Sequence, residues 1–305
     1  MNQLYRAVHM PIGRLIKKIM GHKEKYVICI RKIQKNDDIL TVNSPMDFEI
    51  LFHDKSCWFA DPILQEYCGK TALFMEQFDL KTNCGMIACS ILQDNVFHKP
   101  IPVIKEPFHM SFPLTFIWNG ELYMIPETSA DNSVRLYKVV KYPFKWELVK
   151  RFETKIPLVD SVVLKVCSDK LIILASEPDQ KNGLQVKFVK YFICINNGEF
   201  VIKYDEEYNC KQKFNFKNRN AGKMFMSGKS LVLPTQESTK TDYGFCLNFQ
   251  SISFYNDTDF WLKVPMKQVA PIDINVVGMK LKDEIGVHTY AKSETYEIID
   301  LRYLD

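Results

Sequence analysis

Carboxylates, an imidazole and hydroxyls stand at both ends of a short segment that is predicted to fold back on itself. Thr115–Trp118 and Glu121–Ile125 are predicted strands, and Asn119-Gly120 between them is a strong signal for a two-residue type I′ hairpin turn. Because the two strands are antiparallel, their outer ends meet at the edge opposite the turn. That edge gathers Glu106, His109, Ser111, Glu127, Thr128 and Ser129. Such an edge is either half of a site or a set of solvated loop residues.

The bulk composition limits the classes of function. The 40 basic and 36 acidic residues leave a formal net charge of +4, without the concentrated basic face of a nucleic-acid-binding protein. With 12 glycines the chain has no Gly-rich phosphate loop, and Asn36-Asp37-Asp38 is not the Asp-x-Asp metal motif of common nucleotide-sugar transferases. We therefore expect no cofactor, no bound metal and no nucleic-acid partner.

The cysteines and the N-terminus bear on the compartment. The nine cysteines are an odd number and include no Cys-x-x-Cys pair, which argues against a zinc site or a disulfide framework and for reduced thiols. The N-terminus has basic residues but lacks the apolar core and cleavage site of a signal peptide, and no apolar run is long enough to span a bilayer. These features predict a cytoplasmic protein.

Residues 1–25 differ from the rest of the chain. Apolar residues fall near helical spacing there, lysines and arginines supply the other face, and Pro11 divides the segment into two predicted helical pieces. Such a basic amphipathic segment either lies on an anionic membrane surface, at the inner face of the membrane, or packs against the body of the protein with solvated lysines. Residues 26–305 are predicted to form the folded domain.

Beyond residue 25 the apolar residues alternate with polar ones, which is typical of strands. Tyr26–Arg31 is the first predicted strand, and groups of about four strands then repeat at roughly 45 to 65 residues. Five such groups predict an all-β fold, a five-bladed β-propeller with a short N-terminal helical segment and almost no other helix. The Tyr26 strand would pair with the C-terminal strands and close the ring. A pair of β-sandwiches is the alternative.

Short phrases within these groups carry a family resemblance. They are Phe59-Ala60-Asp61-Pro62, Glu106–Pro113, Tyr123–Ser129, Val159-Asp160-Ser161, Asn220-Ala221-Gly222, Tyr243-Gly244 and Gly286–Thr289. In the order and spacing of these phrases, the chain after residue 25 resembles the N-terminal domain of plant glucosamine inositolphosphorylceramide transferases, which also occurs in bacterial surface-polysaccharide proteins. That domain is similar to the five-bladed propellers of the arabinanase, levansucrase and invertase superfamily.

The resemblance implies a site on the propeller axis, where the innermost strand of each blade begins. Asp61 resembles the blade-one aspartate that acts as base or nucleophile in furanosidase-type propellers. Glu106-Pro107-Phe108-His109 resembles the phrase that carries the general acid in family 43 glycosidases, and Glu127 competes with Glu106 for that role. Asp160 would tune the pKa of the acid from the third blade.

Glycoside chemistry needs two carboxyl groups beside the glycosidic oxygen, one protonated and one ionised. Asp61 is the expected base, and Glu106 or Glu127 is the expected acid. The expected substrate-binding residues are His109, Ser111, Arg219 and His288. Arg219 and the histidines could hold a phosphate of the ligand, although each could equally be a structural or solvated residue.

The sequence therefore predicts a carbohydrate-active protein of surface-polysaccharide or glycolipid synthesis, a glycosyltransferase-like enzyme that binds a sugar or an activated sugar. The expected lack of a secretion signal favours synthesis over extracellular digestion. The alternatives are a glycoside hydrolase of the furanosidase type and a non-catalytic glycan-binding propeller that serves a partner glycan-assembly enzyme. A pure protein-interaction propeller is disfavoured, because it does not need carboxylates where its inner strands begin.

Overall fold

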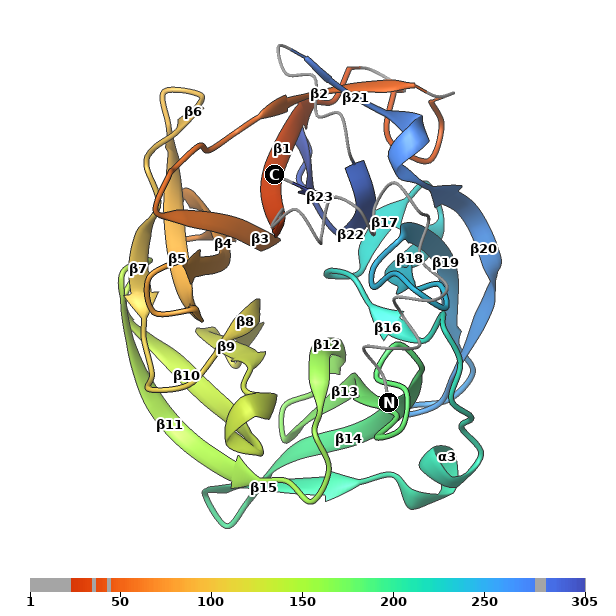
Figure 1. Ribbon diagram of the computed structural model, residues 1–305. Helices are drawn as coiled ribbons and strands as arrows, with labels where there is room; N and C mark the ends of the chain where they lie inside the picture. The colour runs from red at the N-terminus through yellow and green to blue at the C-terminus, as the bar shows by residue number, and fades with distance from the viewer. Residues whose placement is uncertain (1–22, 35–36, 43–44, 278–283, 305) are drawn as a thin grey trace.

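The computed structural model describes residues 23–34, 37–42, 45–277 and 284–304. Over these residues the chain forms five sheets set around a central axis (Figure 1). The predicted all-β, five-bladed propeller is confirmed, and the alternative of two β-sandwiches is wrong. The predicted helical segment at residues 1–25 falls outside the described residues up to residue 22, and the first described strand already begins at Glu24.

The first three blades each use consecutive segments of the chain. Blade one contains β3 (Cys57–Tyr67), β4 (Lys70–Asp79), β5 (Cys84–Gln93), β6 (Val96–Phe97) and β7 (Ile101–Ile104). Blade two contains β8 (Ser111–Trp118), β9 (Glu121–Glu127), β10 (Ser133–Lys141) and β11 (Lys145–Glu153), with a 3-10 turn η1 (Ser129–Asp131). Blade three contains β12 (Val159–Val166), β13 (Lys170–Pro178), β14 (Val186–Asn196) and β15 (Glu199–Tyr204).

The last two blades are less regular. A five-residue helix α3 (Glu206–Cys210) precedes blade four, which contains β16 (Arg219–Asn220), β17 (Phe225–Ser227), β18 (Ser230–Glu237), β19 (Cys246–Phe254) and β20 (Phe260–Val269). Blade five contains β22 (Glu284–Lys292), β23 (Tyr296–Leu304), β1 (Glu24–Lys32), β2 (Met46–Ile50) and β21 (Ile274–Val277), the last preceded by η2 (Pro271–Asp273). No helix among the described residues is long and apolar enough to cross a membrane.

The first and last described strands close the ring. β1 pairs antiparallel with β23 along its whole length, from Glu24 opposite Leu304 to Lys32 opposite Tyr296. β2 then pairs with β1, and β21 pairs in parallel with β2. Figure 1 shows β1 and β23 side by side within one blade although they come from opposite ends of the sequence. This pairing was predicted from the Tyr26 strand, and it ties the two ends of the propeller together.

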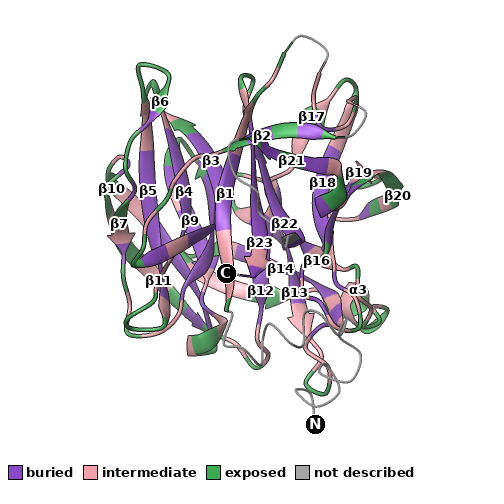
Figure 2. Ribbon diagram, turned by 45° about the horizontal axis from the view of Figure 1, so that its top comes forward, coloured by how far each residue is buried: buried purple, intermediate pink, exposed green. Residues whose placement is uncertain are grey.

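Apolar side chains fill the spaces between neighbouring blades. Leu73 and Met75 of β4 belong to one buried cluster with Ile28 of β1 and Ile298 of β23. Inner strands are buried along most of their length, whereas the outermost strands, such as β11 and β20, alternate toward solvent (Figure 2). The inner strand ends are therefore held by packing on both sides, which fixes the side chains that face the axis.

The β8–β9 hairpin has the turn that the sequence predicts. Asn119 and Gly120 have φ of 50° and 80°, both in the left-handed region that a type I′ turn requires. A methyl group at Gly120 would meet no atom within 4 Å, so only the backbone conformation opposes a side chain there.

We expect Gly120→Ala to lower the free energy of unfolding by about 1 kcal/mol, because an alanine in the left-handed region is strained. Urea unfolding of the variant and the parent measures the difference. Gly183→Ala is the matched control, since Gly183 also has open space around it and no left-handed φ. Equal effects of the two substitutions would contradict the assignment of the cost to the turn.

Candidate functional site

Four inner strands contain a β-bulge that turns a polar or aromatic residue out of the regular pleat. The strand registers shift around Asp61 in β3, Phe112 in β8, Asp160 in β12 and His288 in β22. Asp61, Phe112 and Asp160 have φ of 54°, 42° and 48°, a conformation that costs roughly 1–3 kcal/mol and occurs preferentially at functional sites. The sequence motifs around these residues therefore correspond to the same backbone feature, a β-bulge, in different blades.

Hydrogen bonds connect the bulges around the axis. The backbone N–H of Phe112 donates to Asp61 Oδ2 at 3.1 Å, and the backbone N–H of Asp61 donates to Asp300 Oδ2 at 2.9 Å. The Asn220 side-chain amide donates to the backbone carbonyl of Asp160 at 2.8 Å. Neighbouring blades are therefore joined at the axis by polar contacts, and the orientation of each bulge depends on the next.

His288 lies between two carboxylates. Its Nδ1 is 2.7 Å from Asp300 Oδ1, and its Nε2 is 3.5 Å from Asp61 Oδ1. Asp300 on β23 also accepts the backbone N–H of Thr289 at 2.9 Å, so both of its oxygens are occupied by donors. Asp300 orients the imidazole, and the imidazole presents its other nitrogen to Asp61.

The three groups have different proton affinities. Burial raises the pKa of Asp61 to about 7, since the nearby His288 only partly offsets the loss of water. Burial opposes ionisation of Asp300 too, but His288, Thr289 and the Asp61 N–H outweigh it and hold the pKa of Asp300 below its usual range. Burial also opposes the charge on His288, and the carboxylates of Asp300 and Asp61 outweigh it and raise the pKa of His288. Of the two carboxyl groups, Asp61 is therefore the one whose pKa lies near neutral pH.

A second cluster surrounds Arg219, which begins β16. Its Nε donates to Asp160 Oδ2, and its guanidinium also lies 3.6 Å from Glu127 Oε2 at the end of β9. The guanidinium lies over the ring of Tyr243 at 4.7 Å, a cation–π contact. Burial raises the pKa of Asp160 to about 7, with Arg219 opposing the shift. Arg219 thus joins blades two, three and four at the axis.

Tyr243 lies beside His288 because the chain at Gly244 passes close to the chain at His288. A methyl group on Gly244, which has φ of 53°, would lie 2.4 Å from His288 Cβ. The Tyr243 ring consequently packs against the His288 ring with centroids 5.4 Å apart. The phrases Tyr243-Gly244 and Gly286–Thr289 therefore meet in space, and they link the Arg219 cluster to the His288 cluster.

A third group lies on the side of blade one. Glu76 of β4 is buried, and its Oε1 lies 3.5 Å from His109 Nε2. The Gly85 N–H donates to His109 Nδ1 at 3.0 Å, so in the neutral ring the proton is on Nε2 and faces Glu76. Burial lowers the pKa of His109, and burial raises the pKa of Glu76 well above its usual value. Burial thus favours the uncharged form of both groups.

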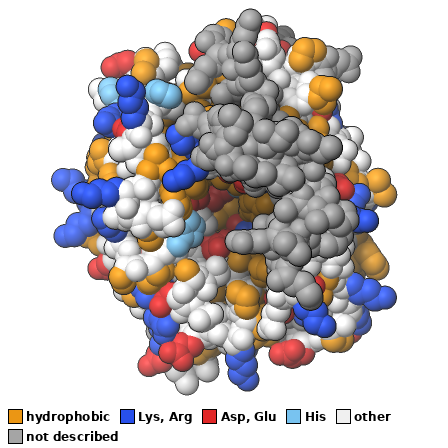
Figure 3. Space-filling model, viewed as in Figure 1, with side chains coloured by type: hydrophobic (Ala, Val, Ile, Leu, Met, Phe, Trp, Pro, Cys, Tyr) orange, Lys and Arg blue, Asp and Glu red, His pale blue; other side chains and the backbone are white. Residues whose placement is uncertain are grey.

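Taken together, the axial site has an excess of carboxyl groups. Of its five carboxyl groups, Asp61 and Asp300 flank His288, Glu127 and Asp160 flank Arg219, and Glu76 lies beside His109. Glu76 Oε1 and Glu127 Oε2 are buried without a hydrogen-bond partner in the described part of the chain. Figure 3 shows a hollow at the centre of one face, with acidic side chains at its bottom and a histidine at its edge. The site suits a ligand that donates hydrogen bonds or carries positive charge.

The same residues include a set with the side-chain types of a metal site. One ligand atom each from Asp61, His288 and Asp300 lies within 4.8 Å of the others. However, Asp300 already accepts the backbone N–H groups of Asp61 and Thr289 and contacts His288 Nδ1. A cation would compete with these donors, so the residues present fit a hydrogen-bonded relay better than a metal site. The expectation of no metal stays a prediction.

The structure separates the predicted site residues into two groups. It brings Asp61, Glu127, Asp160, Arg219 and His288 together at the axis, with His109 at the edge of blade one. Ser111 is buried in the β8 bulge, opposite Glu127. Glu106 lies elsewhere, because it accepts a hydrogen bond from the Tyr137 hydroxyl at 2.9 Å and pairs with Arg135 at 3.1 Å, both on β10. Of the two glutamates, Glu127 is the one beside Asp160 and Arg219.

Several residues of the site were not among those predicted. Asp300 and Glu76 are carboxylates that directly follow apolar runs, Ile298-Ile299 and Ala72–Met75, and that pattern is a signal that could have identified them. Tyr26, at the start of the first strand, stacks against His288 with ring centroids 4.8 Å apart. Phe112 is fully buried and therefore belongs to the core. Trp58 stacks on Phe78 with ring centroids 4.4 Å apart.

The raised pKa of Asp61 predicts a pH dependence of stability. In the folded protein this pKa is about 7, whereas an aspartate in an unfolded chain has a pKa of about 3.9. The folded state therefore holds a proton that the unfolded state releases, and this contribution to stability is lost as pH rises from about 4 through about 7. Relative to the parent, Asp61→Asn should become progressively more stable over this range.

Urea unfolding of both proteins across this pH range tests that expectation. Asp169→Asn, at an exposed turn of blade three, is the control and should show a constant difference from the parent. A pH-independent difference for Asp61→Asn would show that the Asp61 carboxyl titrates alike in the folded and unfolded chains.

Comparisons with solved structures support the fold. The β-fructofuranosidase of family 32 from Bombyx mori aligns with a TM-score of 0.52, covering 79% of this chain and 60% of that one at 12% identity. The catalytic domain of the family 62 α-L-arabinofuranosidase from Coprinopsis cinerea aligns with a TM-score of 0.51, covering 91% of this chain and 97% of that one at 9% identity. At these identities the likeness shows the shared propeller fold alone.

Comparisons with protein sequences show the family. Glucosamine inositolphosphorylceramide transferase 1 of Arabidopsis thaliana is 35% identical over 111 residues, 36% of this chain and 14% of that protein. The protein of the same name from Oryza sativa subsp. indica is 29% identical over 202 residues, 62% of this chain and 25% of that protein. The chain thus spans a quarter or less of the length of these relatives. Residues 37–271 match the family described as glucosamine inositolphosphorylceramide transferase 1, N-terminal, and the chain belongs to that family.

Proposed function

We propose that this chain is a carbohydrate-active domain of glycolipid or surface-glycan synthesis, and that its axial site binds a sugar and takes part in glycosyl transfer. The observation that carries the proposal is Asp61, a buried carboxyl group at the propeller axis whose pKa is raised to about 7. A general base works best when its pKa lies near the working pH, because it is then both ionised and basic enough to remove a proton.

The geometry gives each group a task. Asp61 would accept the proton of an acceptor hydroxyl, while the Phe112 N–H holds one of its oxygens in place. His288, oriented by Asp300, would stabilise the ionised form of Asp61 through the nitrogen that faces it. Burial favours the protonated form of Glu76, which makes it the candidate proton donor, on β4 beside the Asp61 strand in the same blade. Glycoside hydrolysis needs such a pair of carboxyl groups, and transfer to an acceptor hydroxyl uses at least the base.

The charge of the site favours an amino sugar. Carboxyl groups outnumber the cations Arg219 and His288 at the axis, and Glu76 and Glu127 each have a buried oxygen without a hydrogen-bond partner among the described residues. An ammonium group would donate to such oxygens and lower the repulsion between them. The relatives are named glucosamine inositolphosphorylceramide transferase 1, and an amino sugar agrees with the first word of that name.

A non-catalytic sugar-binding domain is the second candidate. Two observations favour it: Arg219 already holds Asp160 and contacts Glu127, and the chain corresponds to a quarter or less of the relatives' length. In that case the propeller would present a sugar or glycolipid to a partner glycan-assembly enzyme. A furanosidase-type hydrolase would use the same Asp61 with water as acceptor. A cytoplasmic place of action is also part of the proposal, supported by nine cysteines without a disulfide.

Binding and crystallography with glucosamine test the proposal. We expect glucosamine to bind more tightly than glucose at neutral pH and to lie in the axial hollow. Glu127→Gln should weaken glucosamine binding, while Glu106→Gln, a matched change of a glutamate paired with β10, should leave it unchanged. Sugar bound only outside the axial hollow, or equal loss in both variants, would overturn the site assignment.

A further inference from the structure

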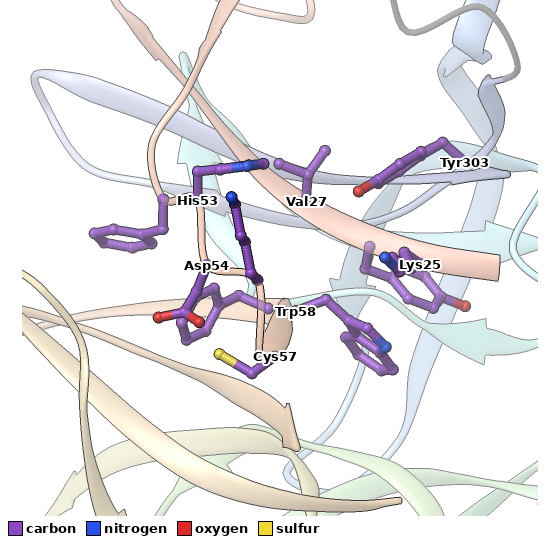
Figure 4. A pocket seen from close by; sticks show the side chains of 11 residues that line it. Lys25, Val27, His53, Asp54, Cys57, Trp58 and Tyr303 are labelled. Atoms are coloured by element: carbon purple, nitrogen blue, oxygen red, sulfur yellow. The ribbon is translucent and has the colours of Figure 1, made fainter. Parts of the chain in front are cut away.

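A second hollow lies beside the axial site, between blades five and one. It has a volume of about 250 Å³ and is formed by the start of β1, the end of β23 and the segment that leads into β3. Among its lining residues are Lys25, His53, Asp54, Lys55, Trp58 and Tyr303. Figure 4 shows Lys25, His53 and Tyr303 coming from three segments, with the Tyr303 hydroxyl pointing into the space between them. We call this hollow the basic cleft.

The charge of the basic cleft is opposite to that of the axial site. Lys25, Lys55 and His53 supply cationic or proton-donating groups, and Asp54 is the single acid in the lining. The Asp54 carboxylate accepts the backbone N–H and the hydroxyl of Ser56 at 2.8 and 2.6 Å, and it lies 3.7 Å from Lys99 outside the cleft. Figure 4 shows this carboxylate on the side away from Lys25 and Tyr303. The partners of the Asp54 carboxylate are therefore Ser56 and Lys99.

Aromatic rings form the wall between the two sites. Trp58 lines the basic cleft and lies 4.9 Å, ring to ring, from Tyr26, which in turn stacks on His288 at 4.8 Å. Trp58 also precedes Asp61 by three residues on the same strand. One ligand could therefore span this wall, with one end at Asp61 and the other among the lysines.

We propose that the basic cleft binds the phosphate group of a ligand whose sugar occupies the axial site. The carboxyl groups of the axial site repel a phosphate, so a ligand that carries both parts must place them apart. Lysine ammonium groups are strong donors to phosphate oxygens, and Lys25 and Lys55 come from two different segments of the cleft. The sugar half of this inference rests on the proposed function, whereas the phosphate half rests on the cleft alone.

Calorimetric titrations with three probes test the inference: inorganic phosphate, glucosamine 1-phosphate and glucosamine. We expect Lys55→Met and Lys25→Gln each to weaken binding of the two phosphate probes by about tenfold, the size of one charge-assisted hydrogen bond. Binding of glucosamine should not change. Lys145→Gln, an exposed lysine of β11, is the control and should change nothing.

The outcomes separate the two proposals. Absence of phosphate binding to the parent protein, or equal weakening of all three probes by the lysine variants, would overturn the basic cleft. If the parent protein binds phosphate in a lysine-dependent way but does not bind glucosamine, the axial sugar site is overturned and the basic cleft is supported. Sedimentation with phosphatidylcholine vesicles, with and without phosphatidylinositol, distinguishes the source of the phosphate. Lysine-dependent binding only to the phosphatidylinositol vesicles would assign it to a lipid headgroup.

Discussion

Asp61→Asn should lower the rate of sugar transfer by about 10²- to 10⁴-fold, the usual contribution of a general base. Asparagine has nearly the same shape and can still accept the Phe112 N–H, so the β3 bulge and the binding of the sugar should be retained. The variant removes the group that accepts the proton and little else. Single-turnover rates measure the loss at saturating donor, and titration with glucosamine measures binding.

The pH dependence of transfer by the parent protein gives an independent measure of the same group. A base must be deprotonated, and the pKa of Asp61 is raised to about 7, so the transfer rate should rise with pH through about 7 and then level. The residual rate of Asp61→Asn should lack this step. Full transfer activity in the variant would exclude Asp61 as the base, and a loss of sugar binding without loss of rate would identify the domain as a binding module.

The fold could be predicted because its signals are local. The Asn119-Gly120 turn specifies a hairpin through the φ values of two residues, and the strand period is visible in any blade. The closure of the ring by β1 and β23 was predicted because the Tyr26 strand stands apart from the five groups, at the opposite end of the chain from the C-terminal strands. The bounds of blade four were harder to foresee, because β16 has only two residues and carries Arg219 within a loop-like stretch.

The site was only partly predictable because its geometry depends on contacts between distant residues. Glu106 and Glu127 flank the same hairpin, and nothing local separates them. Arg135 and Tyr137 bind Glu106 away from the axis. Arg219, which comes from two blades away, lies beside Glu127 and identifies it as the axial glutamate. Asp300 acts through hydrogen bonds to Asp61, more than two hundred residues earlier. The sequence predicts which residues lie near the axis, but contacts between blades determine which of these residues lie next to each other.

The β-bulges explain why short sequence motifs were enough to indicate the inner strands and part of the site. Asp61, Phe112 and Asp160 occupy the same left-handed position in three inner strands, although only two of them are acids. In blade two the position is filled by a buried aromatic residue whose N–H, rather than its side chain, serves the site. A motif can therefore mark a place in the backbone without marking a catalytic side chain, and each blade must be considered separately.

Asp300→Asn should lower the free energy of unfolding by about 3 kcal/mol, the typical cost of removing one member of a buried ion pair. Asp300 is fully buried and accepts the N–H groups of Asp61 and Thr289 beside His288. The amide that replaces the carboxylate has only one accepting oxygen, so its NH₂ group faces one of these N–H donors. The substitution also removes the negative charge beside His288, and the pKa of His288 should therefore fall.

The pH dependence of this loss distinguishes the ion pair from simple packing. The depressed pKa of Asp300 stabilises the fold above about pH 3.9, its unfolded value, and the raised pKa of His288 stabilises it below about pH 6.5. The deficit of Asp300→Asn should therefore be largest between these values and shrink as pH rises through the folded pKa of His288. Denaturant unfolding across this range measures the deficit, and NMR titration of the imidazole follows His288 directly. Asp47→Asn, the same change on the exposed face of β2 in this blade, is the control. A deficit that is equal at all pH values would mean that Asp300 stabilises the ring closure through its backbone contacts and not through His288.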